Sequence, residues 1–229
     1  MQDLDKFISE VDLFSGLAPR DRETLLANAQ ELEFSRRKTI VKASTPAHHL
    51  YLFTRGAAKT YFGDHAETQL LADFLKSGDL FGEEALLFSG EYNLNVITYE
   101  PSAVIALPAE DIRRFMETNP RLCRALAALA LSRARAYRER LYLMSVMPVP
   151  ARLASVLHLL ARRFGKRDRK GTLIALKITH QDLADWVGAS RETVTLFLSS
   201  FRDEGLILCD VRRIIIPDLK ALKKYAPAK

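Results

Sequence analysis

Two charged residues, Arg191 and Glu192, stand directly after Ser190 near the C-terminus of the chain. Arginine can donate two hydrogen bonds to guanine O6 and N7, and glutamate can accept one from cytosine N4. On a helix that begins after Ser190, Thr195 and Leu196 lie on the same face as this pair. The spacing therefore predicts a helix that reads base edges in the major groove of DNA. A plain helical hairpin with a charged, solvated face is the alternative.

The residues that must position this face form two helices joined by a tight turn. Thr179 and Asp182 are close to a capping box at the start of the first helix. Gly188 supplies a left-handed turn, and Ser190 is a good N-cap for the second helix. Ala184 is small where the two helices cross. The segment is typical of a helix-turn-helix, and the stripe that buries the second helix consists of Val194, Phe197, Leu198 and Phe201.

A β hairpin is expected after the second helix, because two β-rich runs, 205–209 and 213–216, flank a short turn. Arg212 and Arg213 at this turn are candidate phosphate contacts, which position a protein on DNA without specifying sequence. The further candidate DNA contacts at the starts of the two helices are Thr179, Gln181 and Ser190.

The charge of the chain is unevenly distributed. Residues 1–150 hold 18 Lys and Arg against 20 Asp and Glu, a net charge of −2, whereas residues 151–229 hold 16 against 8, a net charge of +8. A basic segment attracts polyanions such as nucleic acid or an acidic membrane surface. Its densest run, 162–170, follows an apolar helix and precedes an expected strand at 172–178, which favours a phosphate-contacting loop. The asymmetry predicts two domains with different partners.

Between residues 31 and 107, short β-rich runs alternate with turn residues after an expected helix at 17–29. Strands at this spacing predict a sandwich or barrel. The expected strands are Leu32–Phe34, Thr39–Val41, Leu50–Phe53, Ala58–Phe62, Thr68–Phe74, Leu94–Thr98 and Ala103–Leu107.

A long helix is expected from about Pro120 to Met147, and Pro148 and Pro150 end it, because proline removes a backbone donor and clashes with the preceding turn. A 4-3-4-3 series along this helix is typical of a coiled-coil seam, which predicts dimerisation through it; packing on the barrel alone is the alternative. The series consists of Cys123, Ala127, Ala130, Ala134, Tyr137, Leu141 and Met144.

Three segments of the chain resemble the Crp/Fnr family of bacterial transcription regulators. Residues 13–17 (LFSGL) are similar to its N-terminal entry, and residues 77–83 (SGDLFGE) to its cyclic-nucleotide phosphate cassette. Residues 178–194 (ITHQDLADWVGASRETV) match its helix-turn-helix closely. The resemblance implies a β-roll (jelly-roll) sensor, a dimerisation helix and a winged helix, and it implies that Arg191 and Glu192 read bases.

The chain departs from the cAMP-binding members of that family in the phosphate cassette. Gly82 and Glu83 match the Gly-Glu pair, whose acid contacts the ribose. Asn93 and Leu94, however, stand where those members carry an Arg-Ser pair, and no Lys or Arg occurs in residues 77–112. A phosphate anion needs a charge-assisted partner, so we expect no tight binding of cAMP in their manner.

Two further departures lie in the helices. Tyr137 and Arg138 replace the Thr-Ser pair that reads adenine, so Arg133 or Arg138 is a candidate partner for an anionic metabolite; solvated or interhelical arginines are the alternative. Leu196 replaces the third base reader, an arginine. Leucine cannot donate a hydrogen bond but can contact a thymine methyl group.

Several classes of protein are disfavoured. Two cysteines, Cys123 and Cys209, are too few for a disulfide scaffold, a four-cysteine zinc site or an all-cysteine iron–sulfur cluster. We find no nucleophile elbow, HExxH or P-loop pattern of an enzyme and no metal spacing. No apolar run approaches the roughly 20 residues of a membrane span, and the charged N-terminus is unlike a secretory signal. We therefore expect a cytoplasmic protein without an enzymatic activity. Haem remains an alternative cofactor, with candidate ligands at His48, His49, His65, His158 and His180.

The expected architecture is α+β. It has a β-roll effector-sensing domain (residues 1–118), a dimerisation helix (119–147) and a winged helix-turn-helix (148–229). The expected function is a sequence-specific regulator that binds double-stranded DNA as a homodimer, has RNA polymerase as a further partner, and responds to an effector other than cAMP. A haem-based gas or redox sensor of the same fold, and a protein-interaction module that does not bind DNA, are the alternatives.

Overall fold

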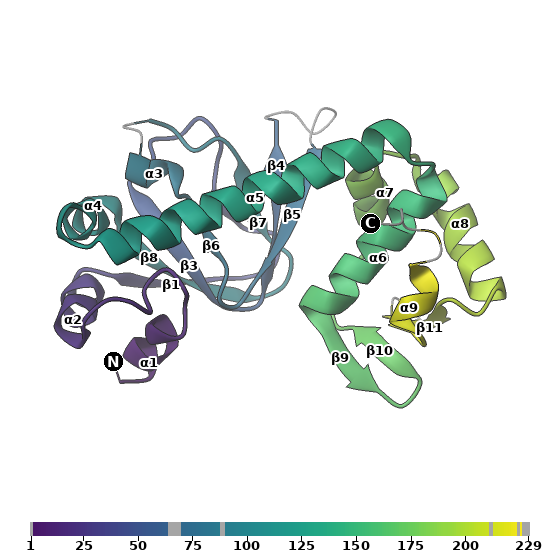
Figure 1. Ribbon diagram of the computed structural model, residues 1–229, viewed down its shortest axis with the longest axis horizontal. Helices are drawn as coiled ribbons and strands as arrows, with labels where there is room; N and C mark the ends of the chain where they lie inside the picture. Colours follow the sequence, from purple (N-terminus) through teal and green to yellow (C-terminus); the bar gives the residue numbers. More distant parts are fainter. Residues whose placement is uncertain (1, 64–69, 88–89, 211–212, 224, 226–229) are drawn as a thin grey trace. The chain divides into compact units, whose positions relative to one another are not determined.

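The computed structural model describes residues 2–63, 70–87, 90–210, 213–223 and 225 (Figure 1). The chain divides into two compact units, residues 1–135 and 136–229. The division falls inside the long helix α5 (Pro120–Val146), whereas the domain boundary expected at Pro148 lies just after that helix and stays a prediction.

Two four-stranded antiparallel sheets form the first unit, in the orders β1-β8-β3-β6 and β2-β7-β4-β5. The strands are β1 (Gln30–Phe34), β2 (Thr39–Val41), β3 (His49–Arg55), β4 (Ala57–Phe62), β5 (Leu70–Lys76), β6 (Leu80–Phe81), β7 (Asn95–Thr98) and β8 (Ser102–Pro108). Both sheets contribute to one apolar core, with Leu52 from β3 and Val96 from β7 fully buried in it. The expected β-sandwich is confirmed; β6 is too short to show a pattern in the sequence.

Helices close the core of the first unit. They are α1 (Gln2–Ser9), α2 (Pro19–Ala27), α3 (Glu84–Leu87), α4 (Ala109–Thr118) and the first half of α5. Ile8, Leu25 and Ile112 from three of them are at most 1% exposed, and Leu122 and Leu126 of α5 join the same core.

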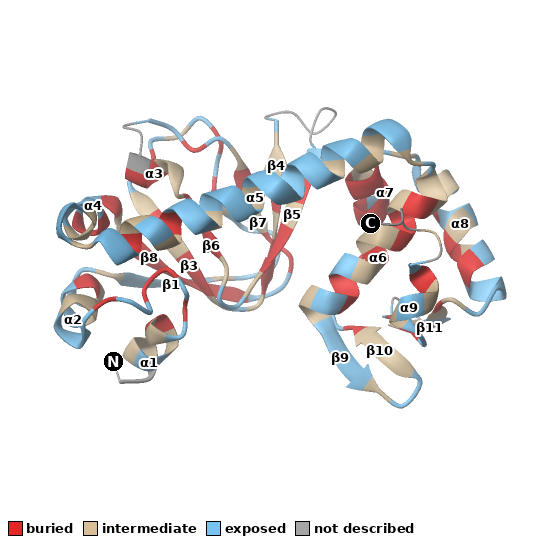
Figure 2. Cartoon of the chain, viewed as in Figure 1, coloured by how far each residue is buried: buried red, intermediate tan, exposed pale blue. Residues whose placement is uncertain are grey.

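Beyond Leu126, α5 has no fully buried residue, and Figure 2 shows that most of its surface is exposed. Three residues of the expected seam, Ala127, Ala130 and Ala134, are exposed in the single chain. The side chains of Leu131 and Leu141 are 67% and 66% exposed. A helix that leaves large apolar side chains in water over several turns favours a partner surface, as the seam predicts.

The second unit contains the end of α5 and, among the described residues, four further helices beside a small sheet of order β11-β12-β10-β9. Its elements are α6 (Val149–Phe164), β9 (Gly165–Asp168), β10 (Gly171–Ile174), α7 (His180–Val187), α8 (Arg191–Asp203), β11 (Leu208–Asp210), β12 (Arg213–Ile216) and α9 (Leu219–Leu222). Its core includes Leu157, Leu183, Val194, Phe201 and Ile216, each at most 1% exposed.

The structure differs from the sequence expectations at the start of this unit. The strand expected at 172–178 ends at Ile174, and the basic run is not a loop, because Lys166 and Arg167 pair with β10 in a hairpin. The sequence did not indicate β9, because a strand is recognised by alternating apolar and polar residues, and β9 is nearly fully exposed with no buried face.

Candidate functional site

The capping box expected at the start of α7 is confirmed. The Thr179 hydroxyl accepts a hydrogen bond from the Asp182 backbone N–H, and the Asp182 carboxylate accepts from the Thr179 N–H at 3.0 Å and from its hydroxyl at 2.6 Å. Asp182 is only 3% exposed. Because its carboxylate is held by two groups of the helix terminus, the box fixes where α7 begins.

The expected turn between the two helices is also confirmed. Gly188 ends α7 in the left-handed region, with φ of +66° and ψ of +54°, and its N–H donates to the Ala184 carbonyl. A Cβ atom at Gly188 would lie 2.8 Å from Cε of Met144. The conformation and the contact both favour glycine at this position.

Ser190 then begins α8 as its N-cap, accepting a hydrogen bond from the Thr193 N–H at 3.1 Å. Val194, Leu198 and Phe201 are buried on the inner face, while Phe197, expected in the same stripe, is half-buried. The inner stripe fixes the rotation of α8 about its axis and so decides which residues face water.

The exposed face of α8 brings together four of the predicted residues. Arg191, Glu192, Thr195 and Leu196 all lie on it, and the Leu196 side chain is 66% exposed. Within the part of the chain that the structure describes, the side chains of Arg191 and Glu192 have no hydrogen-bond or ion-pair partner. Their donors and acceptors are therefore available to an external ligand.

Thr195 is different, because its hydroxyl is engaged inside the protein. Its Oγ1 donates to the Arg191 backbone carbonyl at 2.8 Å and lies 2.8 Å from Nδ1 of His180, the first residue of α7. Burial, followed by the positive charge of Arg191, lowers the pKa of His180. Sequence reasoning considered His180 only as a haem ligand, since no local pattern links residues on two crossing helices.

The other predicted DNA contacts occupy the edges of this surface. Gln181 is exposed and donates from Nε2 to the Asp185 carboxylate at 2.6 Å, and the Ser190 hydroxyl lies 2.9 Å from that of Thr193. Arg213 is exposed at the start of β12, where it pairs with Asp210. Arg212 lies outside the described residues.

One further contact, which the sequence did not indicate, ties the helix-turn-helix to the end of α5. Arg140 donates from Nη2 to the Trp186 carbonyl of α7 at 3.0 Å. The last turns of α5 therefore hold α7 directly, within the second unit.

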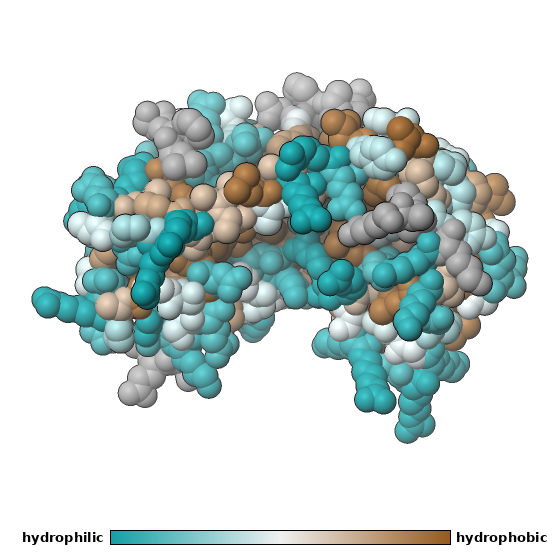
Figure 3. Space-filling view, in the orientation of Figure 1, coloured by the Kyte–Doolittle hydropathy of each residue, from teal (hydrophilic) through white to brown (hydrophobic). Residues whose placement is uncertain are grey.

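The turn of the basic hairpin β9–β10 lies at the opposite end of the small sheet from the connection between β11 and β12. Thr172 beside the first turn pairs with Ile216, whereas Ile174 pairs with Ile214, next to the second turn. Figure 3 shows hydrophilic side chains gathered on this hairpin. The two basic segments therefore do not form one continuous surface along the sheet edge.

In the first unit, Gly82 and Glu83 follow β6. The Glu83 carboxylate forms an ion pair with Nη1 of Arg133 on α5, and Nη2 of Arg133 donates to the Leu80 carbonyl. A Cβ atom at Gly82, where φ is +83°, would lie 2.9 Å from the His49 carbonyl. Two predicted effector residues, Glu83 and Arg133, therefore already bind each other, and a third, Gly82, lies close to the backbone of His49.

The remaining effector candidates are less enclosed. Asn93 is exposed, and Leu94 packs partly against the core. Their neighbour Asn95 is the buried polar group, accepting from the Ala43 N–H and donating to the Gly63 carbonyl. Tyr137 and Arg138 are exposed on α5 in the second unit.

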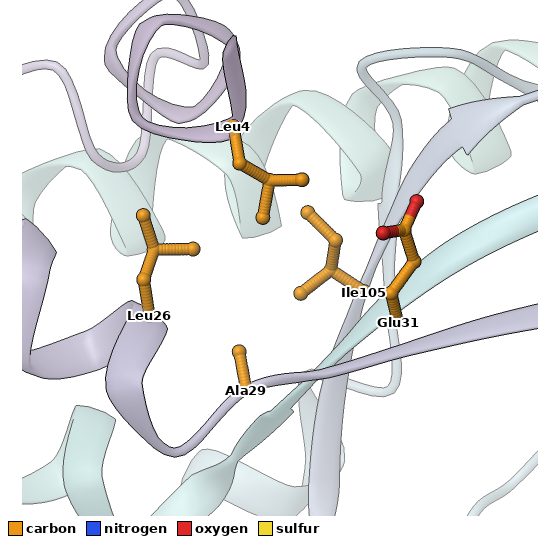
Figure 4. Close-up of a pocket in the computed structure, with 5 residues that line it drawn as sticks. All are labelled: Leu4, Leu26, Ala29, Glu31 and Ile105. Atoms are coloured by element: carbon orange, nitrogen blue, oxygen red, sulfur yellow. The ribbon is translucent and has the colours of Figure 1, made fainter. Parts of the chain in front are cut away.

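A small pocket of about 210 Å³ lies in the first unit beside α1 and α2 (Figure 4). Its lining consists of Leu4, Leu26, Ala29, Glu31 and Ile105. It contains none of the predicted effector residues. Within the described part of the chain, no group of three or more His, Cys, Asp or Glu side chains is arranged to hold a metal ion, and no helix is long and apolar enough to cross a bilayer.

Comparisons with known proteins match both units. Residues 31–119 match the cyclic nucleotide-binding domain family, and residues 151–225 match the Crp-like helix-turn-helix domain family. A cyclic AMP receptor protein of Thermus thermophilus is 31% identical over 93% of this chain and 96% of its own length. A cAMP-activated CRP-like global transcriptional regulator of Mycobacterium tuberculosis is 25% identical over 97% of this chain and 100% of its own length.

Solved structures agree with these matches. A CRP-family transcriptional regulator of Thermus thermophilus has a TM-score of 0.70 and 28% identity, covering 85% of this chain and 96% of that chain. FixK2 from Bradyrhizobium japonicum has a TM-score of 0.77 over 88% of this chain and 98% of that chain, and at 22% identity it supports the fold alone. With an effector-binding-type domain followed by a Crp-like helix-turn-helix domain, the chain belongs to the Crp/Fnr family of transcription regulators.

Proposed function

We propose that the protein binds DNA as a homodimer, with α8 of each protomer in the major groove and Arg191 and Glu192 on base edges. Arg191 donates to guanine O6 and N7 and Glu192 accepts from cytosine N4 in this proposal. Thr195 and Leu196 lie on the next turn of the same face. The flanking contacts to phosphate come from Thr179, Gln181, Ser190, Arg212 and Arg213.

One observation carries the proposal. Arg191 and Glu192 are exposed at the N-terminus of α8, and their side chains have no hydrogen-bond or ion-pair partner among the described residues. The caps at Thr179 and Ser190 and the turn at Gly188 hold that helix from one side. Neither side chain therefore has to break a hydrogen bond or ion pair to the described residues before it binds a base pair.

The dimer, which is typical of the Crp/Fnr family, would form through the exposed apolar face of α5. Two-fold symmetry then requires two half-sites about one helical turn, or ~34 Å, apart. Arg191 favours a G·C pair in each half-site. The neighbouring position differs from the family pattern, because Leu196 replaces an arginine.

The effector in this proposal binds the β-roll and shifts the equilibrium between two arrangements of the dimer. The candidate contacts are Gly82, Glu83, Asn93, Leu94, Arg133, Tyr137 and Arg138. Arg133 neutralises Glu83, and residues 77–112 hold no lysine or arginine. An anionic metabolite would therefore compete with Glu83 for Arg133, and cAMP would lack a partner for its phosphate in the cassette.

RNA polymerase is the further partner in this proposal, and the protein acts in the cytoplasm, where bacterial DNA lies. No enzymatic activity is part of the proposal. The sequence left two alternatives open, a haem-based sensor and a protein-interaction module that does not bind DNA. The same experiments distinguish both from the proposal.

The DNA-reading proposal is tested on a duplex selected from a random pool by the intact protein. We expect Arg191→Ala to weaken binding to that duplex by about 1–3 kcal/mol and to relax base choice at one position of each half-site. Arg202→Ala is the matched control, because Arg202 is exposed in the last turn of the same helix, paired with Asp203. Fluorescence anisotropy at several salt concentrations measures both variants.

Three results would contradict the proposal. They are equal affinity of the intact protein for matched and mismatched duplexes, a loss of affinity in Arg202→Ala as large as the loss in Arg191→Ala, and an affinity that does not fall with salt as phosphate contacts require. A Soret band in the purified protein would favour haem as the effector, and it would not contradict the proposal that Arg191 and Glu192 read DNA.

Calorimetric titration with cAMP tests the effector proposal separately. We expect no saturable binding at micromolar cAMP to the intact protein, because Arg133 is paired with Glu83 and residues 77–112 hold no lysine or arginine. Micromolar binding to the intact protein would show that another group supplies the missing cation.

A further inference from the structure

The single hydroxyl hydrogen of Thr195 limits the hydrogen bonds that this residue can donate to DNA. A threonine hydroxyl has one hydrogen to donate, and the Thr195 hydroxyl donates it to the Arg191 carbonyl at 2.8 Å. The hydrogen between Thr195 and His180 must then come from Nδ1 of His180, at 2.8 Å from Oγ1. The hydroxyl therefore has no hydrogen left for a base, and one of its two acceptor sites is occupied.

The second turn of the reading face is consequently apolar. With its hydroxyl engaged, Thr195 presents chiefly its Cγ2 methyl group, and the adjacent Leu196 side chain is 66% exposed. The first turn, with Arg191 and Glu192, is fully polar by contrast. The apolar group that DNA offers in the major groove is the C5-methyl group of thymine.

We propose that Thr195 and Leu196 act as one apolar surface that selects thymine through its methyl group, and that His180 is the positioning residue that keeps the Thr195 hydroxyl out of the readout. The inference rests on the proposed DNA-reading function. It adds a second, non-hydrogen-bonded specificity element beside the base pair read by Arg191.

His180 can hold this position in either charge state. The neutral ring with hydrogen on Nδ1 donates to Thr195, and the protonated ring donates from the same atom. The titratable and charged groups near His180 are Arg191 on α8, whose charge lowers the pKa of His180 after burial, and Asp182 on its own helix. The selection of thymine is therefore expected to be the same at pH 6 and pH 8.

The first experiment replaces each thymine of the selected duplex, one at a time, by deoxyuridine, which lacks only the C5-methyl group. Burying one methyl group changes an equilibrium constant by about fourfold. We expect a loss of about that size at one or two thymines per half-site and no change at the others. Anisotropy titrations with the full-length protein provide the readout.

The second experiment repeats the series with two variants of Thr195. Thr195→Val keeps the branched shape and the methyl group but removes the hydroxyl, so we expect the thymine-to-uracil ratio to be retained. Thr195→Ser keeps the hydroxyl and removes the methyl group, so we expect the ratio at the sensitive position to fall toward one. Leu196→Ala is expected to lower the ratio in the same way.

The third experiment tests His180 as a positioning residue. His180→Ala removes the Nδ1 donor and exposes the acceptor site of the Thr195 hydroxyl that it occupied, while the bond to the Arg191 carbonyl remains. We expect the thymine preference at the sensitive position to weaken, because this site can then accept from a base amino group, while binding to unrelated DNA is unchanged. His180→Asn places a side-chain N–H donor close to the site of Nδ1, and we expect it to restore the preference. A purely structural role would lower the unfolding midpoint without changing base choice.

Several outcomes would overturn the inference without touching the proposed function. They are a selected half-site that contains no thymine, equal affinity for thymine and uracil at every position, or a preference that survives in Thr195→Ser and is lost in Thr195→Val. If the intact protein shows no sequence preference at all, the proposed function fails first.

Discussion

Replacing Gly188 by alanine tests whether the turn between α7 and α8 depends on both its backbone conformation and its contact with α5. Gly188 has φ of +66°, and an L-residue in the left-handed region costs about 1–2 kcal/mol. The new Cβ would also lie 2.8 Å from Cε of Met144. That atom ends a flexible side chain, so the contact adds a smaller cost as Met144 moves aside.

Gly205 provides a matched control in the same unit. Its φ is +73°, and a Cβ atom there would have no other atom within 4 Å. Gly205→Ala is therefore expected to show the conformational cost alone, about 1–2 kcal/mol. Gly188→Ala is expected to cost more than Gly205→Ala, and the difference measures the Met144 contact.

Urea unfolding at one protein concentration gives the free energies of unfolding. A double-mutant cycle with Met144→Ala isolates the contact, because removing Cε should bring the cost of Gly188→Ala down to that of Gly205→Ala. DNA affinity measured on the same variants should fall for Gly188→Ala alone, since only this turn lies between the two helices. Equal costs in both glycine variants would refute the contact, and a neutral Gly188→Ala would refute the left-handed turn.

Three further predictions concern the capping box, the long helix and pH. Asp182→Ala should lower the free energy of unfolding by about 1–3 kcal/mol in urea titrations, because a buried carboxylate that satisfies the start of α7 is lost; an unchanged midpoint would contradict this. Leu141→Asp on α5 should shift the protein toward monomer in sedimentation velocity, whereas Leu159→Asp on α6, 42% exposed, should not. Burial, then the charges of Lys223 and Arg162, lower the pKa of His158, so the folded state binds fewer protons than the unfolded chain. Stability should therefore fall as pH drops from 7 through about 6.5, and this slope should be shallower in His158→Gln; an unchanged slope would contradict the assignment.

The features that the sequence predicted well are those whose signals are local. The box at Thr179 and Asp182, the turn at Gly188 and the cap at Ser190 each lie within a few residues, and all four residues play the expected roles. The strands of the first unit were predicted for the same reason, because each short β-rich run is bounded by turn residues close to it in the sequence.

The features that the sequence did not indicate depend on residues far apart in the chain. The bond between His180 and Thr195 requires the crossing of two helices, and the ion pair between Glu83 and Arg133 joins residues 50 positions apart. The hairpin at 165–174 shows no pattern, because its outer strand is exposed. The base-reading and effector roles stay predictions until they are measured.

The exposed apolar side chains of α5 have a consequence for every stability measurement on this protein. If they are covered only in the dimer, unfolding is coupled to dissociation, and by mass action the thermal midpoint rises with protein concentration. A single value of the midpoint then has no meaning unless the concentration of protomers is stated with it.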